Sequence, residues 1–190
     1  MTAALIIVDM QRDFMPSGSL AVPDADQIIP RLNDYIQLFQ ERRELVVFTR
    51  DWHPREHSSF VTRGGAWPVH CVQGTAGAQI EPALSFPPLC LLASKATSPD
   101  REAYSGFDGT GLADVLKALG ITRVFVGGVA TDYCVKSTVL DAIKNGFDTL
   151  LLKDGIRGVD LKPGDSQRAV EEMKEAGARF VSFSDVKKMI

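Results

Sequence analysis

The sequence has few cysteines and no long apolar run, and both shortages exclude classes of protein. Its 190 residues contain three cysteines, Cys71, Cys90 and Cys134, with no Cys-x-x-Cys pair. An odd, widely spaced set argues against a disulfide framework and favours a reducing compartment. No apolar run approaches the roughly 18–20 residues that a membrane helix needs. The amino-terminal MTAALIIVDM has no basic flank, so we expect no signal peptide, no membrane association and a cytoplasmic location.

The sequence also has no excess of positive charge. Lys and Arg number 21 against 24 Asp and Glu, which gives a net charge of −3. Nucleic-acid-binding domains usually carry a strongly basic face, so we expect no nucleic-acid partner. Apolar residues make up 45% and charged residues 24%, which is ordinary for a folded domain and argues against wholesale disorder. We therefore expect a single domain over residues 1–190.

Several familiar catalytic and nucleotide-binding motifs are missing. No Gly-x-Gly-x-x-Gly follows the first apolar run, and neither a phosphate-binding loop ending in Gly-Lys-Ser/Thr nor a Gly-x-Ser-x-Gly elbow occurs. The sequence therefore argues against dinucleotide binding, nucleotide binding and serine hydrolase chemistry.

What the sequence does contain is an alternation of short apolar runs with amphipathic stretches. The runs predict strands at residues 3–8, 45–48, 89–93, 124–129, 149–152 and 180–183. Most are apolar at every position, as in strands buried on both faces. Apolar residues at helical spacing predict helices near residues 28–39, 112–119, 135–143 and 169–176. This alternation predicts a three-layer α/β/α fold around a six-stranded, mainly parallel, doubly wound sheet.

One long segment, residues 51–88, interrupts the alternation. It has no extended periodic pattern, is rich in Pro and Gly, and contains all three histidines of the chain, His53, His57 and His70. Loops of this length in a compact domain are usually either functional or disordered. Clustered histidines are typical of metal sites, so we expect a long metal-binding loop here.

Reactive side chains follow three of the predicted strands. In open α/β sheets, ligands bind beyond the carboxyl ends of the strands. Asp9 follows the first strand, Lys95 the third and Cys134 the fourth, and an acid, a base and a thiol suit nucleophilic catalysis. Each has an ordinary alternative: Asp9 as a helix cap or ion-pair partner, Lys95 as a side chain reaching solvent, and Cys134 as a small buried residue.

Cys134 is expected in the first turn of a helix. Asp132 is placed to be its N-cap, and the free N–H groups and dipole of a helix start favour a thiolate. The two glycines that precede this turn permit unusual backbone geometry. Backbone amides of Ala130 and Cys134 could then face a developing oxyanion. Cys71 and Cys90 are interpreted as structural residues.

Asp51, His53 and His70 form a candidate metal site. An extended Asp51-Trp52-His53 segment projects its carboxylate and imidazole to the same side, and His70 can close the site from the far end of the loop. This ligand set suits Zn best, with Fe or Mn as alternatives, and leaves coordination positions open. His57 is a candidate fourth ligand. The alternative is a group of loop histidines that hydrogen-bond to water.

Five motifs resemble those of the isochorismatase-like cysteine hydrolases, and within them the nicotinamidases. In chain order they are VDMQRDF (8–14), TRDWHP (49–54), AWPVHCVQGTAG (66–77), SKATSPDREAYSGF (94–107) and GGVATDYCV (127–135). The resemblance covers nearly the whole chain. It implies a metal-dependent amidohydrolase that converts nicotinamide, and also pyrazinamide, to the acid and ammonia through a thioester.

The resemblance also implies residue roles. The catalytic triad falls on Asp9, Lys95 and Cys134. The metal ligands, which many members of the wider family lack, fall on Asp51, His53 and His70, while His57 falls where members differ. The pocket for the substrate ring falls on Phe14, Trp67, Tyr104, Val129 and Tyr133, and Val129–Ala130 falls on a cis peptide.

Two other functions are compatible with the sequence. One is a metal-free member of the same family that acts on another small amide or a vinyl ether, although the intact Asp51, His53 and His70 argue against it. The other is a non-enzymatic metal-binding or redox-sensing protein that uses Cys134. The expected partner is a small-molecule substrate, nicotinamide, and a homo-oligomer is compatible with the sequence.

Overall fold

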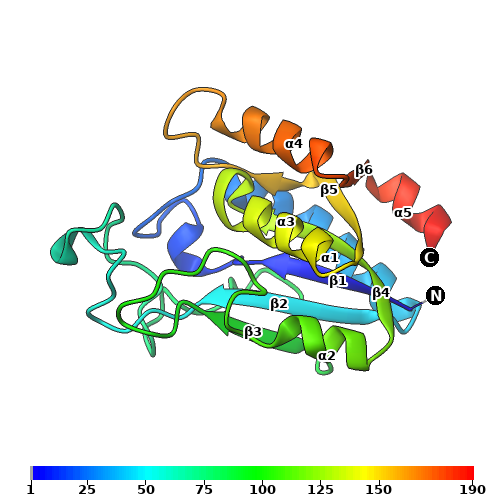
Figure 1. Ribbon diagram of the computed structural model, residues 1–190, viewed down its shortest axis with the longest axis horizontal. Coiled ribbons are helices and arrows are strands. Elements are labelled where there is room, and N and C mark those ends of the chain that lie inside the picture. The colour runs from blue at the N-terminus through cyan, green and yellow to red at the C-terminus, as the bar shows by residue number, and fades with distance from the viewer. Residues whose placement is uncertain (1) are drawn as a thin grey trace.

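A parallel six-stranded sheet forms the centre of the computed structural model, which describes residues 2–190. The strands are β1 (Thr2–Val8), β2 (Leu45–Asp51), β3 (Leu91–Lys95), β4 (Ile121–Val129), β5 (Asp148–Arg157) and β6 (Arg179–Val181). Their spatial order is β3-β2-β1-β4-β5-β6, and every neighbouring pair is parallel (Figure 1). The predicted doubly wound fold is confirmed, and the sheet is parallel throughout. The strand order reverses between β1 and β4, where such sheets bind ligands.

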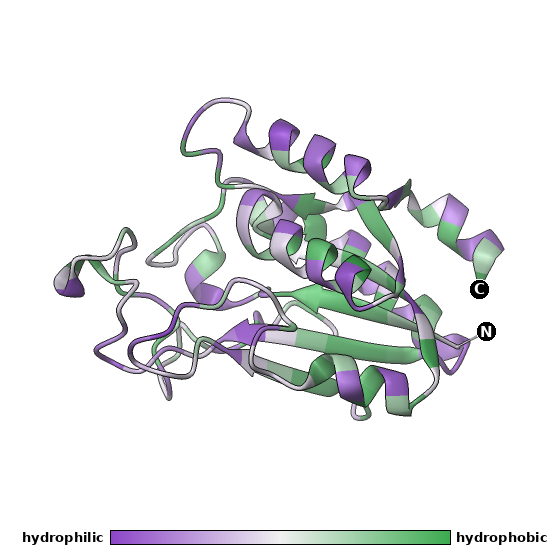
Figure 2. Ribbon diagram, viewed as in Figure 1, coloured by the Kyte–Doolittle hydropathy of each residue, from purple (hydrophilic) through white to green (hydrophobic). Residues whose placement is uncertain are grey.

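Helices cover both faces of the sheet. They are α1 (Ile29–Glu41), α2 (Leu112–Ala118), α3 (Lys136–Lys144), α4 (Asp165–Glu175) and α5 (Phe183–Met189). Alternate residues of β1 point to opposite faces: Leu5 and Ile7 pack with α1 and α5, whereas Ala4 and Ile6 pack with α2, α3 and α4. Figure 2 shows the result, with apolar strands inside and polar outer faces on the helices.

Burial on both faces explains why the strands are apolar at nearly every position. From Ala3 to Val8, no residue of β1 is more than 2% exposed. Each fully buried Leu or Ile side chain stabilises the fold by about 1.5–3 kcal/mol relative to an exposed one. The central strands therefore form a rigid base for the side chains that follow them.

Several predicted boundaries differ from the structure. β3 begins at Leu91 rather than at Leu89, which is 90% exposed and follows two prolines that have no N–H to donate. β4 begins three residues before the predicted start at Val124, and β5 continues past the predicted end at Leu152. The last strand ends at Val181, before the predicted end, because the chain there enters α5.

Helix α5 was not predicted from the sequence. It begins with a capping box in which the Ser182 and Asp185 side chains each bind the other residue's backbone N–H. The Ser-x-x-Asp spacing is a recognised start signal, and it was overlooked because Phe183 extends the preceding apolar run.

The long segment between β2 and β3 extends beyond the carboxyl ends of the strands (Figure 1). Within residues 52–90 it contains one short 3-10 helix, η3 (Val61–Arg63), and no regular strand. Isolated bridges pair it with the rest of the fold and with itself, at Gln11–Ile80, His53–Val72 and Phe60–Trp67. Of the two alternatives for this loop, the structure therefore favours a defined conformation over disorder.

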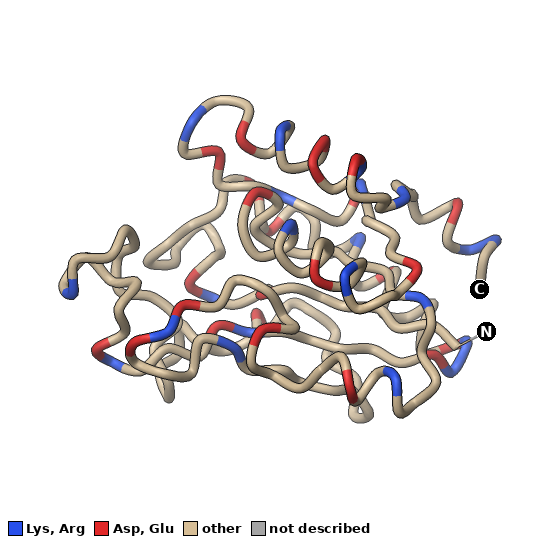
Figure 3. Tube along the Cα trace, in the orientation of Figure 1, with Lys and Arg blue, Asp and Glu red and all other residues tan. Residues whose placement is uncertain are grey.

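Charges are distributed over the helices and loops. Lys and Arg are interspersed with Asp and Glu, with no continuous basic face in this view (Figure 3). Among residues 2–190, every helix is too short or too polar to cross a membrane.

Candidate active site

The carboxyl ends of four neighbouring strands bring the candidate site together. Asp9 directly follows β1, while Asp51 and Lys95 are the last residues of β2 and β3. Cys134 lies in η4 (Thr131–Val135), a single π-helical turn that follows β4. Because β1 and β4 are neighbours, the acid and the thiol meet at the switch point of the sheet.

Unusual backbone geometry brings these strand ends close. Asp9 has a φ of 49°, in the left-handed region that few non-glycine residues adopt, and its N–H donates to Thr49 O at 3.2 Å. Gly128 has a φ of 120°, and a Cβ there would lie 2.1 Å from the carbonyl oxygen of Val8. Only glycine permits this approach of β4 to β1. Such strained positions persist where the surrounding structure fixes them.

Lys95 lies at the centre of a buried polar cluster. Its Nζ atom is 2.8 Å from Asp9 Oδ2 and 3.4 Å from Cys134 Sγ, and it also contacts Asp51 Oδ1. Thr49 Oγ1 donates to the other oxygen of Asp9 at 2.7 Å. Lys95 is 1% exposed, so the alternative of a lysine that reaches solvent is wrong.

Burial controls the charges of this cluster. It raises the pKa of Asp9, an effect that Lys95 opposes and Asp51 reinforces. Burial disfavours the charge of Lys95, but the attraction of Asp51 and Asp9 outweighs it and raises the pKa of Lys95 well above its ordinary value. Burial also raises the pKa of the Cys134 thiol well above its usual range, although Lys95 opposes the shift. The helix start favours a thiolate at Cys134, whereas burial favours the neutral thiol.

Asp132 does not cap the helix as predicted. The residue that precedes η4 is Ala130, which makes no side-chain capping bond, and the Val129–Ala130 peptide is cis. The Asp132 carboxylate instead accepts hydrogen bonds from the backbone N–H groups of Val159 at 3.0 Å and Asp160 at 2.9 Å. It thereby attaches the loop between β5 and α4 to the turn that carries Cys134.

Asp51, His53 and His70 present atoms suited to a metal ion. One ligand atom from each lies within 4.8 Å of the others. His53 Nδ1 lies 3.1 Å from the carbonyl of His70, and His70 Nδ1 lies 2.7 Å from that of Pro68. A carbonyl only accepts, so each Nδ1 carries the proton and each Nε2 keeps a lone pair. This is the tautomer that a metal requires, and the three residues fit a divalent ion.

The charge states of Asp51 and His70 also fit a metal. Burial raises the pKa of Asp51, but Lys95, His53 and His70 together lower it below its ordinary value. Burial lowers the pKa of His70, which keeps this imidazole neutral. A charged carboxylate and a neutral imidazole are the forms that bind metal ions.

A cavity adjoins both Cys134 and the candidate metal ligands Asp51, His53 and His70. Four of the five predicted ring-pocket residues line it, namely Phe14, Trp67, Tyr104 and Tyr133, together with Asp51, His53, His70, Ala130 and Cys134. Trp67 Nε1 donates to the Tyr104 hydroxyl at 3.0 Å, and the Trp67 and Tyr133 rings meet edge to face at 4.9 Å. Val129, the fifth, is the last residue of β4; it is fully buried in the core and is not among the residues that line this cavity.

Comparison with known proteins identifies the family. Residues 3–185 match the isochorismatase domain family. The chain belongs to this family. The nicotinamidase of Escherichia coli (strain K12) is 38% identical over 96% of the chain and 95% of its own length. Among solved isochorismatase-family structures, the pyrazinamidase of Pyrococcus horikoshii in complex with zinc has a TM-score of 0.92 and 54% identity, covering 96% of this chain and 100% of that one. PnC1 from L. infantum in complex with nicotinate has a TM-score of 0.90 and 41% identity, covering 96% and 93%.

Sequence reasoning missed several residues that line this isochorismatase-family cavity. They are Leu20, Val22, Glu102 and Val159. Glu102 is the most polar of these, and its Oε1 lies 3.9 Å from His53 Nε2. Burial lowers the pKa of His53, but Glu102 and Asp51 outweigh it and raise that pKa overall. One feature of the sequence could have pointed to Glu102: it lies in the same motif, residues 94–107, as Lys95 and Tyr104.

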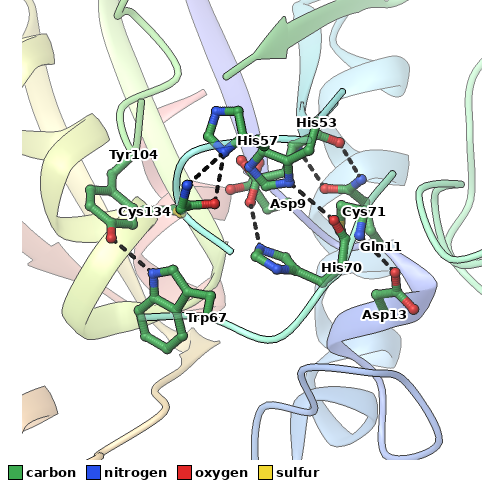
Figure 4. A network of polar contacts seen from close by, with 12 residues as sticks. Asp9, Gln11, Asp13, His53, His57, Trp67, His70, Cys71, Tyr104 and Cys134 are labelled. Atoms are coloured by element: carbon green, nitrogen blue, oxygen red, sulfur yellow. Dashed lines mark hydrogen bonds and ion pairs between the residues drawn. The ribbon is translucent and has the colours of Figure 1, made fainter. Parts of the chain in front are cut away.

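His57 lies beside the candidate metal ligands, but protein groups contact both of its ring nitrogens. Nε2 lies 3.1 Å from the carbonyl of Arg101 and Nδ1 lies 2.7 Å from Ser59 Oγ. The carbonyl requires a proton on Nε2, so Nδ1 accepts from the serine hydroxyl. In this arrangement the serine hydroxyl uses the lone pair of Nδ1, although His57 also offers an atom within 4.8 Å of ligand atoms of His53 and Glu102. Figure 4 shows how His57, His53 and His70 lie around this part of the site.

Proposed function

We propose that this chain is a nicotinamidase that hydrolyses nicotinamide to nicotinate and ammonia, and pyrazinamide in the same way, through a thioester on Cys134. One observation carries the proposal: the buried Asp9–Lys95–Cys134 cluster and the Asp51, His53 and His70 group adjoin a single aromatic-lined cavity. The E. coli relative named as a nicotinamidase and the nicotinate-bound structure of PnC1 support it.

Asp9 is the proposed base for the buried thiol. A protonated Cys134 needs a proton acceptor before it can attack, because the thiolate is the nucleophile. One oxygen of Asp9 lies within 4.8 Å of Sγ. Asp9 Oδ2 lies 2.8 Å from Lys95 Nζ, and a carboxylate oxygen has a second lone pair that can take the thiol proton. The charge of Lys95 favours the charged form of the two carboxylates beside it.

The proposed reaction proceeds in two halves. Sγ attacks the carboxamide carbon as its proton passes to Asp9, and the backbone N–H groups of Ala130 and Cys134 stabilise the oxyanion. Asp9 returns the proton to the nitrogen as the C–N bond breaks, and ammonia leaves. Asp9 then takes a proton from the water that attacks the thioester. As the C–S bond breaks, Asp9 returns that proton to Sγ, which releases the acid and restores the thiol and the charged Asp9.

The ring pocket and the metal site together select the substrate. Phe14, Trp67, Tyr104 and Tyr133 line the cavity next to Cys134 and would enclose a flat ring there. A divalent ion held by Asp51, His53 and His70, with Zn preferred over Fe or Mn, would supply an electrophilic partner for the pyridine nitrogen. These three ligands argue against the metal-free alternative. We leave His57 out of the proposed ligand set because both of its ring nitrogens are already used.

Ammonia release from nicotinamide tests this function directly. We expect turnover of nicotinamide and pyrazinamide, and much slower turnover of benzamide, which has the same carboxamide but no ring nitrogen. A chelator should reduce the nicotinamide rate, and added Zn should restore it. Equal turnover of benzamide and nicotinamide, unaffected by chelation, would instead favour a metal-free hydrolase.

The ligand set predicts different outcomes for two neighbouring histidines. His53→Ala removes a ligand with a free Nε2, so the purified chain should lose stoichiometric metal. His57→Ala removes a residue bonded to Ser59 and Arg101, so the chain should keep its metal but unfold at a lower temperature. Metal content by mass spectrometry and thermal unfolding distinguish these effects. Equal metal loss in both variants would contradict the three-ligand set.

The carboxylate of Asp132 is predicted to affect substrate binding more than chemistry. It accepts one hydrogen bond from the N–H of Val159, which lines the cavity, and one from the N–H of Asp160. Hydrogen bonds to a charged group are worth about 1.5–3 kcal/mol each, so in Asp132→Ala we expect KM for nicotinamide to rise by roughly tenfold or more. The kcat value should change less. A large loss of kcat with an unchanged KM would show that Asp132 acts on Cys134 instead.

We further propose that residues 1–190 form one hydrolase domain that works in the cytoplasm. The three cysteines are free thiols in the structure, which suits a reducing compartment. The exposed apolar side chains of Leu89 and Leu119 are compatible with a homo-oligomer, which size-exclusion chromatography with light scattering would detect.

A further inference from the structure

We propose that Gln11 and Asp13 are positioning residues that hold the two halves of the metal site at a fixed separation. Both lie in the segment that follows β1 and includes η1 (Arg12–Phe14). The inference rests on the metal-dependent function proposed above. Neither residue offers an atom to the metal, and each acts through a backbone bond to a ligand segment.

Gln11 holds the backbone of Asp51. Its side chain is fully buried, its Nε2 donates to Asp51 O at 2.8 Å and to Ala78 O at 2.9 Å, and its Oε1 accepts from Asp51 N at 2.8 Å. The regular pairing of β1 with β2 ends at Phe48, so Asp51 has no strand partner on this side. The Gln11 amide supplies the donor and acceptor that a neighbouring strand would have supplied. Without it, each buried backbone group would cost about 1–3 kcal/mol.

Asp13 holds the segment that carries His70. Its Oδ2 accepts from the N–H of Cys71 at 2.7 Å, and its own N–H donates to Gly77 O at 3.0 Å. Cys71 has a φ of 47°, so this bond supports a strained residue directly after a ligand. A Cβ at Gly77 would lie 2.2 Å from the Asp13 carboxylate, so only glycine lets the loop pass this close.

The bonds of Gln11 and Asp13 together connect metal ligands that come from different parts of the fold. Asp51 ends a core strand, whereas His70 comes from the long loop and needs support from outside that loop. Gln11 and Asp13 are two residues apart on one segment, and Figure 4 shows both on the side of the site where Cys71 and His70 lie. Residues that orient metal ligands typically change metal affinity by about 10–100-fold when they are replaced. We expect effects of this size here.

Zinc affinity, measured by competition with a fluorescent chelator, tests the inference. Gln11→Met keeps the length of the side chain but removes all three hydrogen bonds, and Asp13→Ala removes the bond to Cys71. Each should raise the Kd for zinc by about 10–100-fold. Asp13→Asn keeps an acceptor for Cys71 and should lie nearer the wild type. Arg12→Ala changes an exposed residue of the same turn and is the matched control, with an unchanged Kd.

The outcomes separate this inference from the proposed function. If the wild type binds zinc and Asp51→Ala does not, but Gln11→Met and Asp13→Ala lower only the melting temperature, the two residues are merely structural and the inference fails. A wild-type chain that binds no zinc overturns the metal-dependent function as well. If Gln11→Met does not fold, Asp13→Asn and Asp13→Ala decide the question: equal zinc affinity in both and in the wild type overturns the inference.

Discussion

Replacement of Cys134 by alanine is expected to reduce turnover of nicotinamide by roughly 10⁴-fold or more, because the reaction then has no nucleophile. The Cys134 side chain is 6% exposed and adjoins the cavity, so removal of its sulfur creates no void deep in the core. The variant should therefore remain folded and keep its metal. Ammonia release, circular dichroism and metal content measure these three expectations separately.

The same prediction can be tested in the wild type by trapping the thioester intermediate. Acid quenching of the wild type during turnover, followed by peptide mass spectrometry, should locate the acyl group on Cys134. Cys90→Ser is the matched control, because Cys90 is half-buried and outside the cavity lining, and it should keep full activity. Cys71→Ser should keep the same chemical mechanism. An adduct on any other residue would remove Cys134 from its role.

Asp9→Asn is expected to lower kcat by about 10²–10⁴-fold, the usual contribution of an acid–base group. The amide cannot take the thiol proton. It also leaves Lys95 with Asp51 as its remaining acidic contact, so the melting temperature should fall as well. Steady-state kinetics and thermal unfolding measure the two effects.

Thr49→Val separates the loss of the base from a general disturbance of the cluster. It removes the hydrogen bond to Asp9 Oδ1 but keeps the carboxylate and its contact with Lys95. We expect a much smaller loss of kcat than in Asp9→Asn. Near-wild-type activity in Asp9→Asn would remove the general base from the mechanism.

The parts of the site that follow local rules could be predicted from the sequence. Asp9 comes directly after a buried apolar run, and parallel strands deliver their carboxyl ends to one edge. Asp51 and His53 share a side because the chain between them is extended. The boundary of β3 was less predictable, because Leu89 and Cys90 have the same apolar character as the strand they precede.

Other parts depend on contacts between residues far apart in the sequence. Gln11 binds Ala78 across 67 positions, and Asp132 binds Val159 across 27. The spacing of apolar residues along the sequence does not indicate such long-range hydrogen bonds. The opposing influences on the pKa of Cys134 have a related origin: the helix start is a local feature that lowers it, whereas burial is a property of the whole fold and raises it.

The carboxylate of Asp51 faces in two directions, and this limits how the site can be redesigned. One oxygen contacts Lys95, while the other lies 3.9 Å from His70 Nε2. An engineer who wished to build a metal-independent amidase on this scaffold could therefore discard both imidazoles but would have to retain the acid. Without it, a completely enclosed ammonium group would lose one of its two countercharges, a change that typically costs several kcal/mol. Lys95, which lies beside Cys134, thus determines which metal ligands can be replaced: the histidines can, and Asp51 cannot.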